Sequence, residues 1–194
     1  MMMVFTRARL RALPLLGTSL HRNCSGIADR FALLQAERQF DIDEQQLQQQ
    51  YKLLMAETHP DRHSCSSIDE QEAAADMASQ LTDAYAILRA PHLRAVHLLE
   101  LLGAPLDEDT SGDVLGAGFL MEVMDVRETL EDSGSDPTPL ATLREDNHRK
   151  MSHLCMQLVG AFSAKDLELA RSLTAQLQYL QKIEEEIHAR MPVV

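Results

Sequence analysis

The chain has 194 residues, of which 45% are hydrophobic and 25% charged, and its formal net charge at pH 7 is -12. This length allows one ordinary domain or two small ones, and the hydrophobic content excludes disorder throughout. Leucine far outnumbers isoleucine and valine, and only 4% of the residues are aromatic. We therefore expect an all-α fold with cores of Leu, Ala and Met. The acidic balance repels phosphate backbones, so we expect protein partners and no nucleic acid.

The first 28 residues differ in composition from the rest of the chain. They contain Arg7, Arg9, Arg11 and Arg22 but no acidic residue. An Arg-rich, acid-free segment with scattered leucines is typical of an organellar transit peptide, so we predict one over 1–28 and a location in the mitochondrial matrix. Its interrupted apolar run is too short to span a bilayer, and we expect no membrane association. The alternative is a basic tail without a targeting role.

A first helical unit is predicted over 29–103. Asp43 and Gln46 have the spacing of a capping box, which predicts a helix over 44–57. Because Pro60 disfavours helical geometry in the residue before it, this helix should end near residue 58. The apolar period predicts further helices over 68–89 and 92–102, the last of which ends at Gly103.

A second unit is predicted over 115–194, after an acidic segment. Residues 104–114 include Pro105 and Gly112 and show no apolar period, so we predict a linker there. Helices are expected over 115–131, 139–162 and 164–190, with Ser163 and Asp166 at the start of the last helix. Three antiparallel helices of this length would form a small bundle.

The first and last bundle helices carry apolar residues outside their core stripes. At about 100° per residue, Phe119, Val123, Val126 and Leu130 share one face of the first helix. The last helix has a stripe of Leu173, Leu177, Leu180 and Ile187. A second strip on the first helix consists of Leu120, Met121 and Met124, and Tyr179 lies off the stripe of the last helix. Either these residues form a binding surface, or each helix contacts two neighbours and buries both strips.

The tripeptide His59, Pro60, Asp61 lies between the two predicted amphipathic helices of the first unit. With these helices and the AYAIL sequence that follows, residues 31–88 resemble a J domain. The resemblance implies that this loop stimulates ATP hydrolysis by a DnaK-type heat-shock chaperone. Pro60 would fix the loop, and Asp61 offers a carboxylate for a charge-assisted bond with an arginine. The alternative, a metal site of His59, Asp61 and His63, is disfavoured because no helical turn spans Pro60.

The helix before this loop departs from the J-domain pattern. The family usually has a basic face there, whereas this helix is rich in Gln and has Lys52 as its only cation, opposed by Glu57. Arg62 stands where Lys is usual and keeps the charge. We therefore expect weak electrostatic steering toward a chaperone.

Three further stretches resemble the HscB family, called Jac in fungi. They are LRAPHLRAVHLLELLG (88–103), FLMEVMDVRETLED (119–132) and LTAQLQYLQKIEEEI (173–187). The resemblance implies a J domain joined to a three-helix bundle that binds an IscU-type iron–sulfur scaffold. It also implies which residues bind the scaffold: Leu120, Met121, Met124, Asp125, Arg127, Glu128 and Tyr179.

The sequence thus predicts a mitochondrial co-chaperone of iron–sulfur cluster assembly. We expect no enzymatic activity and no cofactor, since the chain has no Gly-rich phosphate loop and no nucleophile elbow. Its three cysteines form no C-x-x-C pair, so neither a zinc site nor a disulfide framework is indicated. Two alternatives stay open: a general J-domain co-chaperone for other clients, and a helical metal hydrolase using His59 and His63.

Overall fold

The computed structural model describes residues 28–58, 67–106, 115–134 and 136–191. Over these residues the chain is all-helical, which confirms the predicted fold class. Among the described helices, none is both long and apolar enough to cross a membrane. The helices are α1 (Arg30–Leu33), α2 (Glu44–Glu57), α3 (Ile68–Arg89), α4 (Pro91–Leu101), α5 (Ala117–Ser133), α6 (Pro137–Ala164) and α7 (Leu167–Arg190).

Capping side chains set several of the helix boundaries. α2 and α3 have the predicted bounds, and Asp43 caps α2 by accepting from the backbone N–H groups of Gln45 and Gln46. α6 begins earlier than predicted because Asp136 caps it and accepts from the N–H of Thr138 at 2.9 Å. Its first helical residue is a proline, which is well suited to that position.

The prediction that Ser163 starts the last helix is wrong. α6 continues through Ser163, whose hydroxyl donates to the carbonyl oxygen of Val159 at 2.7 Å. α6 ends at Ala164, and the capping residue Lys165 that follows has a left-handed backbone with φ 57°. Asp166 alone caps α7 by accepting from the N–H of Leu169 at 3.1 Å. Serine hydroxyls often bond to a carbonyl one turn back, and Ser163 does so here instead of capping.

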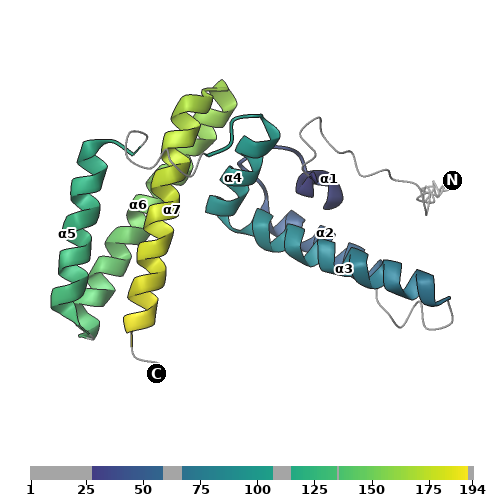
Figure 1. The fold of residues 1–194 in the computed structure, drawn as a ribbon, viewed down its shortest axis with the longest axis horizontal. Coiled ribbons are helices and arrows are strands. Elements are labelled where there is room, and N and C mark those ends of the chain that lie inside the picture. The colour runs from purple at the N-terminus through teal and green to yellow at the C-terminus, as the bar shows by residue number, and fades with distance from the viewer. Residues whose placement is uncertain (1–27, 59–66, 107–114, 135, 192–194) are drawn as a thin grey trace, which may run out of the picture.

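The helices form a bundle and a projecting hairpin (Figure 1). α5, α6 and α7 lie side by side, whereas α2 and α3 pair and extend away from the bundle. α4 lies between them, in contact with both α3 and α7. The end of the hairpin where α2 finishes and α3 begins is therefore far from α5.

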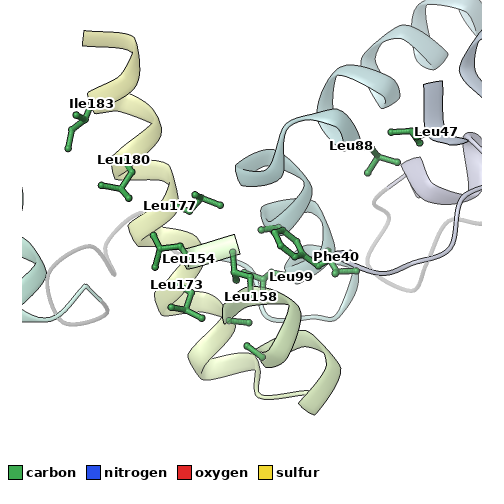
Figure 2. Packing of buried hydrophobic residues seen from close by; sticks show 14 of the residues in the cluster. Phe40, Leu47, Leu88, Leu99, Leu154, Leu158, Leu173, Leu177, Leu180 and Ile183 are labelled. Carbon is green, nitrogen blue, oxygen red and sulfur yellow. The ribbon is translucent and has the colours of Figure 1, made fainter. Parts of the chain in front are cut away.

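The hairpin and the bundle share one hydrophobic core. Figure 2 shows Phe40 and Leu99 next to Leu158 of α6 and the neighbouring side chains of α7. The ring of Phe40, which lies in the segment between α1 and α2, stacks on Phe162 of α6 with the ring centroids 5.5 Å apart. The segment with Phe40, the helix α4 and the bundle are thereby packed against one another. We call this contact region the junction, defined by Phe40, Arg94, Leu99, Leu158 and Phe162.

Arg94 is a buried charged residue of the junction, with only 6% of its surface exposed. Its guanidinium carbon lies 5.0 Å from the centroid of the Phe40 ring, and one Nη donates to the carbonyl oxygen of Leu88 at 2.7 Å. The first contact is a cation–π interaction, and the second satisfies a carbonyl at the end of α3. Arg94 therefore ties α3 and the Phe40 segment to α4.

The start of the described chain is also anchored. The carboxylate of Asp29, which is 3% exposed, caps α1 and forms an ion pair with Arg38 at 2.6 Å. His97 of α4 accepts a hydrogen bond from the backbone N–H of Arg30 through Nε2. Burial, together with the nearby Arg30 guanidinium, lowers the pKa of His97. The neutral ring can then serve as an acceptor.

Candidate functional site

The hairpin tip is the first candidate region. His59, Pro60 and Asp61, as well as His63, lie outside the described residues, so their predicted role stays a prediction. The structure describes the two helix ends that flank them. α2 ends at Glu57 and is followed by the capping residue Thr58, and α3 begins after Ser67, which forms a reciprocal capping box with Glu70.

The two helices of the hairpin are held together by aromatic stacking. The rings of Tyr51 and Tyr85 are nearly parallel, at 8°, and their centroids are 4.3 Å apart. The hydroxyl of Tyr51 also lies 3.4 Å from the Thr82 hydroxyl. Leu47 and Leu81 are buried between the helices. The chain segment with the tripeptide thus joins two helices that are fixed to each other.

The second candidate region is the face of α5 with the predicted scaffold-binding residues. We call Leu120, Met121, Met124, Asp125, Arg127, Glu128 and Tyr179 the α5 patch. Met121 and Met124 are 68% and 70% exposed. Asp125, Arg127 and Glu128 are also exposed, whereas Leu120 and Tyr179 are half-buried. The two methionines are therefore the most exposed apolar residues of the α5 patch, and the scaffold-binding role of all seven residues stays a prediction.

Tyr179 is half-buried because it packs against α5. Its ring meets that of Phe119 edge to face, at 84° with the centroids 6.3 Å apart. The Nζ of Lys182 lies 5.5 Å from the centroid of the Tyr179 ring. Arg127 lies one helical turn after Met124 on α5. One of its Nη atoms is 3.9 Å from a carboxylate oxygen of Glu186 on α7. The first and last bundle helices are thus in contact through these side chains, and Tyr179 is held by its neighbours Phe119 and Lys182.

Phe119, Lys182 and Glu186 are neighbours of the α5 patch that the sequence reasoning missed. The period places Phe119 in the core stripe of α5. Within that stripe Val123 and Leu130 are buried, whereas Phe119 and Val126 are half-buried. Lys182 follows Tyr179 by three residues, and this helical spacing could have indicated their contact.

The charge of α5 limits what the patch can bind. The helix contains five acidic residues and one arginine, which gives it a net charge of -4. Thioether side chains adapt to irregular apolar surfaces. The α5 patch is therefore suited to a protein surface with an apolar centre and basic residues around it.

A clamp on Glu184 fixes α7 against α6. Its carboxylate accepts from Arg144 Nε at 2.8 Å and from Asn147 Nδ2 at 3.2 Å, and lies 3.0 Å from His148 Nε2. Burial by itself would raise the pKa of Glu184, but the hydrogen bonds from these three residues together lower it. Asn147 is buried and also donates to the carbonyl oxygen of Leu180. This clamp stabilises the position of the helix that carries Tyr179.

A groove of about 650 Å³ lies on the side of α5 that faces α6. Leu154, Leu180 and Phe119 form apolar parts of its wall. At its rim Lys150 and Glu122 form an ion pair at 2.9 Å. Since these charges compensate each other, the groove has no evident preference for a charged ligand.

The described residues provide no metal site. Within 28–58, 67–106, 115–134 and 136–191, no three His, Cys, Asp or Glu side chains are grouped so that they could hold an ion. Burial raises the pKa of the half-buried thiol of Cys155, an effect that the nearby Arg94 opposes. A thiol of this kind is a poor nucleophile and fits a packing role.

Comparisons with known proteins give a consistent result. Residues 116–188 match the family described as the HSCB C-terminal oligomerisation domain. A co-chaperone protein HscB homolog of Bordetella pertussis is 31% identical over 168 residues, which cover 85% of this chain and 97% of that protein. The crystal structure of human co-chaperone protein HscB is similar with a TM-score of 0.77 and 28% identity, over 83% of this chain and 81% of that one. Chaperone HscB from Vibrio cholerae has a TM-score of 0.72 at 27% identity, over 83% of this chain and 96% of that one.

Proposed function

The chain belongs to the HscB family of co-chaperones, and on this basis we propose that it serves iron–sulfur cluster assembly. In this proposal it binds an IscU-type scaffold at the α5 patch and brings it to a DnaK-type heat-shock chaperone. It then stimulates the ATPase of that chaperone through the loop that follows α2. The protein catalyses no covalent chemistry of its own, and the relatives it matches are named co-chaperones.

One observation supports the proposal most directly. Met121 and Met124 are exposed on α5 of the bundle, whereas α2, which precedes His59–Pro60–Asp61 in the sequence, ends at the far end of the hairpin (Figure 1). Two separate regions allow one protein to hold a client and a chaperone together. An apolar residue pair with about 70% exposure on an acidic helix has no role in the core and is typical of a binding surface.

The loop and the patch would contribute different chemistry. Pro60 restricts the backbone of the loop, and the Asp61 carboxylate is suited to an arginine of the ATPase domain. At the α5 patch, Met121, Met124 and the exposed edge of Tyr179 would bury apolar surface of the scaffold. Asp125 and Glu128 would interact with basic residues around it.

The ATPase rate of a mitochondrial DnaK-type chaperone tests the proposal. We expect the full chain and an IscU-type scaffold together to raise this rate more than either does alone. His59→Gln and Asp61→Asn should each abolish the stimulation and leave scaffold binding unchanged. Stimulation that survives in both variants would contradict the role of the loop. Stimulation without any scaffold binding would instead favour a general J-domain co-chaperone.

We further propose that the protein works in the mitochondrial matrix. The support is the acid-free segment 1–28 with its four arginines. A reporter fused to residues 1–28 should be imported into mitochondria, whereas replacing the arginines by glutamine should leave it in the cytosol. If the unmodified fusion stays cytosolic, the segment is a basic tail without a targeting role.

A further inference from the structure

Lys182 of α7 is an exposed cation at the edge of the α5 patch. Its Nζ lies over the Tyr179 ring, 5.5 Å from the centroid. Among the described residues, no acidic side chain forms an ion pair with Lys182, whereas Arg127 of α5 pairs with Glu186. An ammonium group has three N–H donors, and contact with an aromatic ring leaves donors free. Lys182 can therefore bind a further anionic group.

The three glutamates that follow Lys182 on α7 are directed to other neighbours. Glu184 belongs to the clamp on α6. Glu185 is close enough to His92 of α4 to raise the pKa of that ring, against the larger lowering by burial. Glu186 points to α5, where it lies 3.9 Å from the arginine of that helix. These described neighbours thus leave the charge of Lys182 uncompensated.

The position of Lys182 along α7 places it beside the α5 patch. Phe119 of α5 contacts Tyr179 of α7, and about two turns further along both helices Arg127 lies close to Glu186. The two helices therefore run in the same direction. Lys182 lies between these two contacts, so its ammonium group is next to the middle of the patch and not at one end of it.

The apolar centre of the patch separates Lys182 from the acidic residues. Arg127 lies on the flank of α5 that faces α7, as its contact with that helix shows. At about 100° per residue, Met124 lies about 60° further round the helix, Glu128 about 100° and Asp125 about 160°. The patch thus has a positive edge on the side of α7 and a negative edge on the outer side of α5, with apolar residues between them.

We propose that Lys182 is a specificity-determining residue, which binds an acidic side chain of the scaffold and fixes the orientation of the scaffold on the α5 patch. Apolar contact is not directional, so Met121 and Met124 alone would allow the scaffold to bind in more than one orientation. Opposite charges at two edges favour one orientation and disfavour the reverse. The matching surface has an apolar centre, basic residues facing α5 and a carboxylate facing Lys182. This inference rests on the proposed function and specifies how its client is recognised.

Three variants of Lys182 in the full chain separate charge from packing. Lys182→Arg keeps a cation near the Tyr179 ring, Lys182→Met keeps an aliphatic stem without the charge, and Lys182→Glu reverses the charge. Lys165→Glu is the matched control. This lysine is also exposed, and it precedes α7, about four turns away from Lys182. Because both lysines are exposed, the melting temperatures should stay close to that of the unchanged protein.

The readout is the Kd for a purified IscU-type scaffold, measured by calorimetric titration. We expect Lys182→Met to raise it about threefold and Lys182→Glu about tenfold, whereas Lys182→Arg and Lys165→Glu should change it less than about twofold. Between low and physiological salt, binding of the unchanged protein should weaken more than binding of Lys182→Met, which has one screened contact fewer. An unchanged Kd for Lys182→Glu would overturn the inference. So would a loss in Lys182→Met that is the same at every salt concentration, since it would indicate a packing role.

A charge exchange across the interface identifies the bound carboxylate. Exposed Asp and Glu residues of the scaffold are changed to Lys one at a time. One such scaffold variant should bind Lys182→Glu more tightly than it binds the unchanged protein. If none does, Lys182 recognises no single carboxylate and the inference is wrong. If the unchanged protein does not bind the scaffold at all, the proposed function fails and the inference with it, whereas normal binding that is indifferent to Lys182→Glu defeats the inference alone.

Discussion

α5 and α7 belong to the same bundle but use their apolar residues in different ways. α7 buries seven residues along its whole length, from Ala170 to Ile187, whereas α5 buries only Val123 and Leu130. The remaining large apolar residues of α5 are half-buried or exposed, with Met121 and Met124 at about 70%. α7 is therefore a core helix, and α5 is a helix whose outer face is exposed.

The largest expected effect comes from a cavity in α7. Leu177 is completely buried, so Leu177→Ala should lower the free energy of unfolding by roughly 2 to 5 kcal/mol. Chemical denaturation measures this loss. If Leu177→Ala costs less than Met124→Ala, the assignment of α7 as the core helix is wrong.

A truncation on α5 should have the opposite profile. We expect Met121→Ala with Met124→Ala to weaken scaffold binding by about 2 kcal/mol, because interface hot spots have costs of this size. The unfolding free energy should stay nearly constant since both side chains are exposed. Calorimetric titration and thermal melting of the same samples measure the two quantities. Tyr179→Ala should lower both, because Tyr179 also packs against Phe119.

The Glu184 clamp gives a pH-dependent effect of intermediate size. The folded-state pKa of this carboxyl is lowered, so its stabilising contribution is present above the ordinary value of 4.5 and is lost as the pH falls below it. Glu184→Gln should cost roughly 1 to 2 kcal/mol at pH 7, which is at the low end for hydrogen bonds to charged groups because Arg144 and His148 are exposed and the Gln oxygen can still accept. Melting curves between pH 7 and pH 3 should show a smaller acid loss for Glu184→Gln than for the unchanged protein. An equal acid loss in both would place the titrating group elsewhere.

The smallest effect is expected at the ion pair between α5 and α6. Lys150 and Glu122 are 45% and 59% exposed, and exposed pairs of this kind contribute little. Lys150→Ala should change the unfolding free energy by less than about 0.5 kcal/mol in denaturant titrations. A larger loss would mean that α5 depends on this contact more than on its two buried residues.

Local signals made much of the fold predictable. The bounds of α2 follow from Asp43 and from the proline at residue 60, and the buried stripe of α7 follows from its period. The exposure of the α5 side chains cannot be predicted from the apolar period. The period shows which residues share a face of the helix, but not how many neighbouring helices cover that face. Hence Phe119 and Leu120 could be placed on faces, while their burial required the structure.

The junction had no local signal at all. Phe40 lies in a non-helical segment and stacks on Phe162, far away in the sequence. The features of composition that separate the two units, such as the acidic segment 104–114, say nothing about whether the units pack together. The burial of Arg94 could not be predicted from the apolar period either, because arginine side chains normally lie on the surface.

The junction also acts as the pivot of a lever. α3 has 22 residues, so at 1.5 Å per residue it extends about 33 Å from the junction to the hairpin tip. A rotation of about 5° at the pivot would displace the tip by about 3 Å, the length of a hydrogen bond. The close packing of Phe40 against Phe162 and Arg94 therefore fixes the position of the hairpin tip relative to the bundle. A substitution at Phe40 would thus act on the position of the tip without changing any residue of the tip or of the α5 patch.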